Sequence, residues 1–202
     1  MRRRAALLLD AAGLTPDAAL RAAAEDERVD ELLVLTVEAA ATTADDRKVA
    51  ALGRALRTAI DAPAGDTDPT LDEARLVAAT IARLDTAHIR LVDLLVRSEQ
   101  PRVESHGGGS YTTRRDFHLS SQLKGTTGLP ERVWPVLAGD LVTLGVLLEE
   151  RAAPASRSGV GGLGRPTDPL RSWAFTDFGR AVVRVLGTDP THPAGPTPPT
   201  GS

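Results

Sequence analysis

The sequence contains no cysteine and few aromatic residues, and both shortages restrict what the protein can be. Without cysteine, a disulfide framework, a thiolate zinc site and a cysteine nucleophile are excluded. Aromatic residues make up 3% of the 202 positions, so aliphatic side chains and alanine must build the interior. With 42% hydrophobic residues at this length, the chain can bury one core or two smaller ones.

Long apolar runs are also missing. The opening MRRRAALLLDAAGL has the arginines of a signal peptide, but Asp10 ends its apolar run (residues 5–9) before the roughly 7–15 residues that such a peptide needs. No stretch approaches the roughly 20 apolar residues of a membrane span. We therefore predict a cytoplasmic protein with no membrane partner.

Charge is distributed unevenly along the chain, whose formal net charge is −3. Residues 1–96 hold 12 Lys+Arg against 17 Asp+Glu, whereas residues 97–188 hold 12 against 9. Such an asymmetry is typical of halves with different roles, although a solvated surface alone also produces it.

The first half has the pattern of a helical bundle. A helix is predicted after Thr15, with that threonine as its cap and Pro16 at its first position. Helices are also predicted within residues 26–43, 42–60, 70–84 and 86–96, where apolar residues recur every three or four positions. The capping residues expected for the last three helices are Thr43 with Asp46, Thr70 with Glu73, and Asp85.

The segment between Val29 and Val37 is apolar on more than one side of its helix. Such a helix is buried among others or is covered by a second copy of the chain. We expect a homodimer, with Val29, Leu33 and Val37 at its interface.

Residues 97–113 are polar and glycine-bearing and are expected to form a loop. The proline-rich residues 189–202 are expected to be disordered. Between them, a helix is predicted to begin near Trp134, because Pro135 weakens the helical pattern before it; we call it the second helix, after its place in the resemblance given below. It is expected to bury Val133, Leu137, Leu141 and Leu144.

Three stretches of the second half together resemble a winged helix-turn-helix of the MarR and PadR kind. They are LSSQLKGTTGLP (119–130), VLAGDLVTLGVLLEE (136–150) and WAFTDFGRAVVRVLG (173–187). The resemblance implies a short helix, a turn, a second helix, two strands flanking a wing, and a closing helix that starts at T-x-x-G-R. Residues 86–96 would form the first helix. From the residues themselves, Gly145 is expected to end the second helix before a strand at 146–148, and Thr176 to cap the closing helix.

The glycines of SGVGGLGRP (158–166) have the G-x-G-x-x-G spacing of a dinucleotide-binding loop. That motif requires a buried strand before it and a helix that starts within it. Pro154, Pro166 and Pro169 oppose both elements. We therefore interpret these glycines as the tip of a long wing, and we predict no cofactor.

No complete catalytic site is visible. HGGGS (106–110) matches an oxyanion-hole motif of esterases, but the G-x-S-x-G elbow that must accompany it is missing. The four histidines have no metal-ligand spacing, and His88 is interpreted as a capping or packing residue. We therefore predict a protein that is not an enzyme and holds no metal.

The predicted fold is mainly α, with a helical bundle over 1–84, a winged helix with a small β-hairpin wing over 85–188, and a tail over 189–202. The predicted function is that of a dimeric regulator which binds double-stranded DNA. The alternative is a non-catalytic protein-interaction module of a phage-related or multi-component assembly, with Trp134 in its interface. The residue expected to contact bases is Arg132, and those expected to contact the DNA backbone are Arg114, Arg115, Lys124 and Thr127. The wing arginines Arg157, Arg165 and Arg171 are expected to follow the backbone or to enter a narrow minor groove; the alternative is a solubilising loop whose arginines contact nothing.

Overall fold

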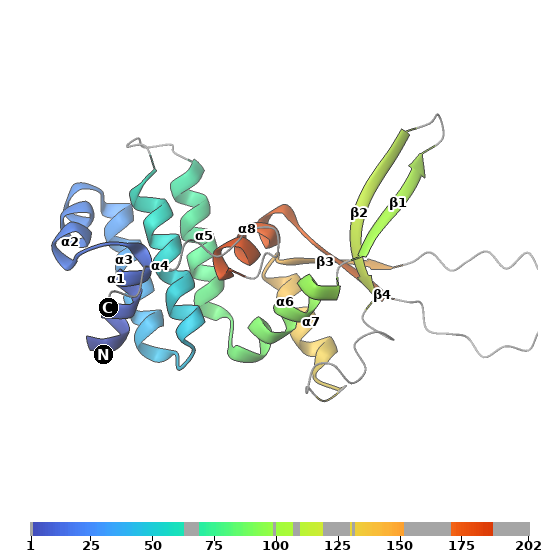
Figure 1. Cartoon of the computed structure of the whole chain (residues 1–202), viewed down its shortest axis with the longest axis horizontal. Helices are drawn as coiled ribbons and strands as arrows, with labels where there is room; N and C mark the ends of the chain where they lie inside the picture. Colours follow the sequence, from blue (N-terminus) through green and yellow to red (C-terminus); the bar gives the residue numbers. More distant parts are fainter. Residues whose placement is uncertain are drawn as a thin grey trace, which may run out of the picture. The chain divides into compact units, whose positions relative to one another are not determined.

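The computed structural model describes residues 2–62, 69–98, 100–106, 110–118, 130, 132–151 and 171–187. The described part is mainly helical with a small antiparallel sheet (Figure 1). Its elements are α1 (Arg2–Ala12), α2 (Pro16–Glu25), α3 (Glu27–Thr42), α4 (Asp46–Ile60), α5 (Pro69–Arg83), α6 (Thr86–Ser98), β1 (Gln100–His106), β2 (Ser110–His118), α7 (Trp134–Thr143), β3 (Leu147–Arg151), β4 (Arg171–Phe175) and α8 (Asp177–Leu186).

The chain divides into two compact units, which we call the helical unit and the sheet unit. The helical unit comprises Met1–Ile89 and Ala181–Ser202, and the sheet unit comprises Arg90–Arg180. The boundaries fall inside α6 and α8. None of the described helices is long and apolar enough to cross a membrane.

Helix α4 packs against most of the helical unit, since it contacts α1, α3 and α5. Its Leu52 and Leu56 are fully buried together with Leu8 of α1 and Ile81 of α5. Helices α1 and α4 approach closely because Gly53 has no side chain: a β-carbon there would collide with the carbonyl oxygen of Leu8. The expectation of an aliphatic core is confirmed.

Most of the predicted helix starts are confirmed, and one capping residue was assigned wrongly. The Thr15 hydroxyl accepts a hydrogen bond from Ala18 N, with Pro16 at the first helical position of α2. Helix α4 is capped by Asp45 and not by Thr43, because the Asp45 carboxylate accepts hydrogen bonds from the backbone amides of Arg47 and Lys48, the second and third residues of the helix. The Thr43 hydroxyl instead accepts from the Asp45 amide.

Residues 97–113 do not form the loop that the sequence predicts. Helix α6 continues to Ser98, and β1 pairs with β2 in an antiparallel hairpin. The prediction weighed polarity and glycine, whereas Val103 and Thr113, which pair in register, have the branched side chains that favour strands. HGGGS therefore lies between two paired strands, with His106 opposite Ser110.

The four strands form one antiparallel sheet in the order β1-β2-β4-β3. Leu147 pairs with Phe175 and Phe117 with Trp173. Leu147, Trp173 and Phe175 are buried, and α7 packs against β3. The two strands predicted to flank the wing are thereby present, and β3 begins at Leu147, one residue later than expected.

The elements of the sheet unit begin and end largely where the sequence predicts. Helix α7 starts at Trp134, and Gly145 follows it with a φ of 72°, a conformation that favours glycine. Of the four residues expected to be buried by this helix, only Leu137 and Leu141 are. Val133 and Leu144 are half-buried, because they stand at the two ends of the helix.

Candidate functional site

The outer face of α7 is the surface that the sequence predicts to meet a partner. Its inner face is buried through Leu137, Ala138 and Leu141. The residues exposed at its start and along its other side are Arg132, Pro135, Val136, Gly139, Asp140 and Thr143. The predicted face is therefore open to solvent, and Val136, at 63% exposure, is the most exposed large apolar side chain on it.

The chemistry of this face is poor in groups that read bases. Arginine, lysine, asparagine and glutamine are the usual readers of purine edges in the major groove, and α7 offers only Arg132, which stands just before its first turn. Asp140 adds a negative charge. The face is thus suited to contacting a phosphate at one end and an apolar surface along its length.

A compact junction holds the start of α8 against the end of α7. The Thr176 hydroxyl donates to the Gly145 carbonyl at 2.6 Å and accepts from the Gly179 amide at 2.8 Å. The Thr176 amide donates to the Val146 carbonyl at 3.1 Å. Thr176 therefore caps α8, as predicted, and also links it to the residues that connect α7 with β3.

Gly179 and Arg180 complete the T-x-x-G-R motif at the same junction. A β-carbon on Gly179 would collide with the carbonyl oxygen of Val146, so only glycine permits this approach. The Arg180 guanidinium lies 5.9 Å from the centre of the Phe175 ring, within range of a cation–π interaction. Each defined position of the motif thus has a structural role that fixes α7, β3 and α8 together.

The sheet brings together several predicted DNA-contacting arginines, and its register adds others. Arg114 and Arg115 lie on β2, where Arg114 pairs with Arg102 of β1. Arg171 opens β4 and pairs with Arg151, the last residue of β3.

Sequence reasoning missed Arg102 as a candidate because its segment was predicted to be a loop. The signal that would have found the hairpin was the presence of residue types that favour strands: Val103 in β1, and Tyr111, Thr112, Thr113 and Phe117 in β2. Lys124, Thr127, Arg157 and Arg165 lie outside the described residues.

The glycine cluster at 158–166 also lies outside the described residues. The described elements on either side of it are β3 and β4, two antiparallel strands that pair as far as Arg151 and Arg171. A dinucleotide fingerprint requires a helix directly after its glycines. Because residues 152–170 lie outside the described part, the interpretation of these glycines as the tip of a wing stays a prediction.

The predicted dimer-interface residues differ in how much surface they offer. Val29 is buried in the core of its own chain, with 6% of its surface exposed. Leu33, Val37 and Trp134 are half-buried. Val34, which the prediction did not single out, is 50% exposed and lies at the centre of the segment.

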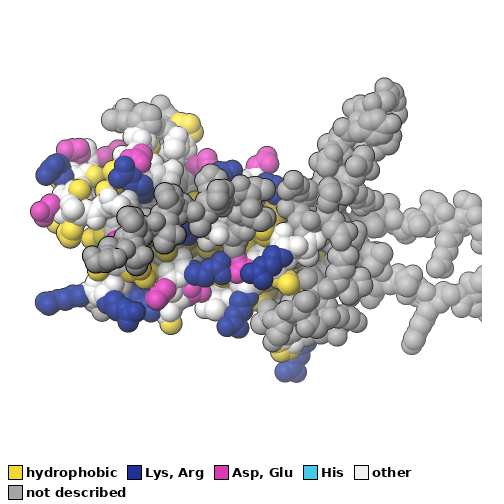
Figure 2. All heavy atoms as spheres, viewed as in Figure 1, with side chains coloured by type: hydrophobic (Ala, Val, Ile, Leu, Met, Phe, Trp, Pro, Cys, Tyr) yellow, Lys and Arg dark blue, Asp and Glu magenta, His cyan; other side chains and the backbone are white. Residues whose placement is uncertain are grey.

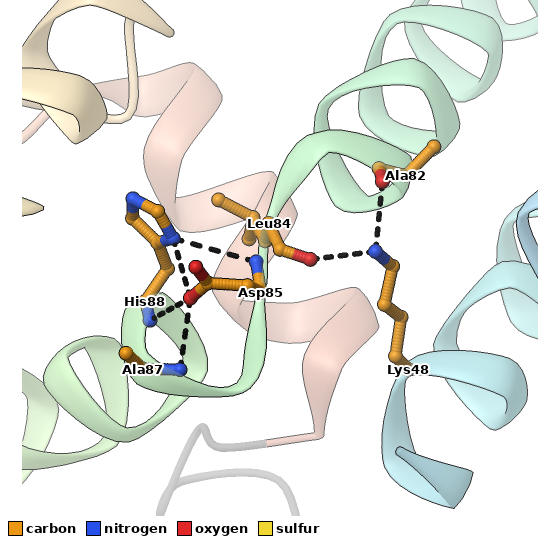
Figure 3. Close-up of polar contacts among 6 residues, drawn as sticks. All are labelled: Lys48, Ala82, Leu84, Asp85, Ala87 and His88. Carbon is orange, nitrogen blue, oxygen red and sulfur yellow. Dashed lines mark hydrogen bonds and ion pairs between the residues drawn. The ribbon is translucent and has the colours of Figure 1, made fainter. Parts of the chain in front are cut away.

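A polar cluster joins α5 to α6 in the helical unit (Figure 3). The Asp85 carboxylate accepts from the amides of Ala87 and His88, which confirms it as the cap of α6. His88 is buried, and its Nδ1 lies 2.8 Å from Asp85 Oδ1 and 3.3 Å from Asp85 N. Partial burial acts to raise the pKa of Asp85, but the hydrogen bonds from His88 outweigh it and hold that pKa below its ordinary value.

Two basic side chains of α4 donate hydrogen bonds to backbone carbonyls at the ends of other helices. Lys48 Nζ donates to the carbonyls of Ala82 and Leu84 at 2.7 and 2.6 Å (Figure 3). Arg54 Nε donates to the carbonyl of Val185 at 2.7 Å. Burial lowers the pKa of Lys48, although the nearby carboxylates of Asp85 and Asp45 act to raise it. These contacts satisfy helix-end carbonyls, so the cluster is structural.

Within the described ranges, no group of three or more His, Asp or Glu side chains is arranged to hold a metal ion. No protein-family model matches the chain, and neither a curated protein nor a solved structure matches it. The candidate site is therefore defined by the chain's own residues: the outer face of α7 and the arginines of the sheet.

Proposed function

We propose that this protein binds double-stranded DNA through its sheet unit, as a winged helix-turn-helix of the MarR and PadR kind. The order α7, β3, β4, α8 supports this assignment, because it follows the order that the resemblance implies. The hairpin of β1 and β2, which the resemblance does not include, stands between α6 and α7. The residues between β2 and α7, where the resemblance places a further helix, lie outside the described part.

The observation that carries the proposal is the register of the sheet. Arginine is matched with arginine twice, as Arg102 with Arg114 and as Arg151 with Arg171. Arginine is well suited to phosphate, because its guanidinium is always charged and can donate two parallel hydrogen bonds. The sheet unit as a whole holds 12 Lys+Arg against 10 Asp+Glu, whereas the helical unit holds 12 against 17.

The outer face of α7 refines the proposal. Because it offers only Arg132 as a reader of bases, the protein contacts the DNA backbone and discriminates little between sequences. Two duplexes of unrelated sequence and equal length should therefore bind with similar affinity. Pairing of two copies, which the sequence predicts, is not required for such contacts and stays a prediction.

Fluorescence anisotropy of a labelled duplex, titrated with salt, tests the proposal. Binding should weaken steeply as salt rises, with a slope that reports the phosphates neutralised. The double variant R151Q/R171Q should bind more weakly and reduce that slope by about 2, since roughly one unit is lost for each phosphate contact. The matched control is R21Q/R83Q, which removes two exposed arginines from the helical unit and should change neither quantity. Absence of binding at low salt would contradict the proposal.

A second function is favoured by one observation, the 63% exposure of Val136 beside the exposed Pro135. An apolar helix face next to a half-buried tryptophan is typical of a protein interface. A photo-crosslinking residue in place of Val136 should then yield adducts with protein and not with nucleic acid. The same residue in place of Leu148, which is exposed on β3, is the control.

A further inference from the structure

The exposed face of α3 carries a feature that the proposed DNA contact does not use. The residues on it are Glu27, Asp30, Glu31, Val34 and Glu38, which are all exposed and, apart from the adjacent Asp30 and Glu31, follow one another at spacings of three or four. Leu33 and Val37 flank Val34 on the same side and are half-buried. We call these seven residues the α3 face: an apolar centre with carboxylates beyond both of its ends.

The acidity of the helical unit is concentrated around this face. Residues 16–42, which span α2 and α3, hold two arginines and seven acidic residues, and this net charge of −5 equals that of the whole helical unit. On the α3 face, Glu31 forms an ion pair with Arg75 of α5. Among the residues that the structure describes, Glu27, Asp30 and Glu38 have no ion-pair partner.

Elsewhere the visible surface of the helical unit shows basic and acidic side chains interspersed (Figure 2). A surface of mixed sign keeps a protein soluble without selecting a partner. A helix face with an apolar centre and only carboxylates around it instead selects a positively charged partner.

The chemistry of the α3 face rules against several occupants. Nucleic acid and anionic lipid headgroups are repelled by its carboxylates. A second copy that packed its own α3 antiparallel, centred on Val34, would place Asp30 of each copy opposite Glu38 of the other. Like charges so close disfavour that arrangement.

We propose that the α3 face docks a basic amphipathic segment of a partner protein. Apolar side chains of that segment cover Val34, Leu33 and Val37, while its lysines or arginines meet the unpaired carboxylates. This is the helix-in-groove mode of recognition, with anchors at helical spacing. The inference concerns a different face from the DNA contact and stands independently of it.

The test uses the full chain and a labelled amphipathic helix of leucine and lysine, about 18 residues long. The comparison peptide has serine in place of leucine, so it keeps the charge and loses the apolar side. The leucine–lysine helix should bind at least about tenfold more tightly than the serine–lysine peptide. Equal affinity of the two peptides would overturn the proposal, since charge alone would then explain binding.

Variants of exposed residues locate the site. V34S should weaken binding of the leucine–lysine helix about tenfold and leave that of the serine–lysine peptide unchanged. The triple variant E27Q/D30N/E38Q should weaken binding of both peptides. The matched controls are L148S, which changes a β3 leucine of similar exposure (47% against 50% for Val34), and D10N/D72N/E73Q, which removes three exposed acids from α1 and α5.

Three results would overturn the proposal. One is wild-type affinity in V34S and in the acidic triple variant, and another is an equal loss in the control variants. The third is a doubled mass in light scattering that V34S abolishes, because the α3 face would then join two copies of this chain. Duplex DNA binding, measured on V34S and on the acidic triple variant, should stay at the wild-type level, so failure of either proposal is recognised separately.

Discussion

In the described residues, the helical unit and the sheet unit each contain one glycine at a close approach between backbone segments. The two units differ in the groups that donate hydrogen bonds to the carbonyls at their helix ends. Gly53 brings α4 against α1, and Gly179 brings α8 against the residue before β3. In the helical unit, long basic side chains reach helix-end carbonyls, as Lys48 and Arg54 do. In the sheet unit, a threonine hydroxyl and a glycine backbone serve this purpose at the α7–α8 junction.

This difference has a consequence for how the two units tolerate change. A lysine or arginine side chain adjusts through several torsions, so small shifts of the helices are absorbed. A hydroxyl and a glycine amide leave no such freedom. The sheet unit should therefore be the more sensitive to the addition of a single methyl group.

The largest effect is expected for Gly179→Ala, because the new β-carbon would collide with the carbonyl oxygen of Val146. We expect a loss of about 3 kcal/mol or the loss of the native sheet unit. Both tryptophans, Trp134 and Trp173, belong to this unit, so tryptophan fluorescence during urea unfolding reports it. The control Gly139→Ala has open space around its β-carbon and should stabilise α7 by about 0.5–1 kcal/mol. Equal stability of the two variants would show that the junction is not tight.

Gly53→Ala should destabilise the helical unit by about 2 kcal/mol. Its β-carbon would meet the carbonyl oxygen of Leu8 and the side chain of Ala11, while the gain in helix propensity offsets part of the cost. Far-UV circular dichroism measures this change, because most of the described helices belong to this unit. An unchanged midpoint would mean that α1 shifts away from α4 at little cost.

Lys48→Met should cost about 2 kcal/mol at high pH, because two carbonyls at the end of α5 lose their donor. The pKa of Lys48 is lower in the folded protein than its ordinary value of 10.5. The folded state therefore binds this proton less well than the unfolded state, and the lysine's contribution to stability rises with pH. The difference in unfolding free energy between wild type and variant should grow as the pH approaches 10.5. A difference that shrinks with pH would contradict the assignment.

The smallest effect is expected at Asp85. Asp85→Ala should cost about 1 kcal/mol through loss of the α6 cap, and Asp85→Asn less, since an amide oxygen also caps. The pKa of Asp85 lies below its ordinary value of 3.8, so its charge stabilises the fold above that value. The advantage of wild type over Asp85→Asn, measured by chemical unfolding, should disappear as the pH falls through the lowered pKa. A constant difference down to the acid limit would exclude a role for the carboxylate charge.

The sequence predicted helices α2 to α6 of the first half because their signals are local, whereas α1 was not predicted. Thr15 with Pro16, and Asp85, cap the helices that they were expected to cap. The apolar periodicity of residues 46–60 correctly placed Val49, Leu52 and Leu56 in the core. Thr43 was wrongly preferred to Asp45 because both residues have capping chemistry and only the turn geometry distinguishes them.

The candidate site was predictable only in part. The start of α7 at Trp134 and the exposure of Arg132 followed from Pro135 and the spacing of the leucines. The pairing of Arg102 with Arg114 did not, because strand register depends on contacts between residues distant in sequence. The exposure of Val34 was not predicted, because the sequence of an apolar residue among apolar neighbours does not indicate which of them faces solvent.

The sequence by itself determined the caps at Thr15, Asp85 and Thr176 and the start of α7, since each depends on hydrogen bonds and backbone conformations within a few residues. Tertiary structure alone decided that residues 100–106 and 110–118 pair as strands, that Val29 faces the core while Val34 faces solvent, and that arginines are matched in register in the sheet. The physical reason is that burial and register are properties of the packed chain. A local pattern permits several such arrangements, and the packing selects one.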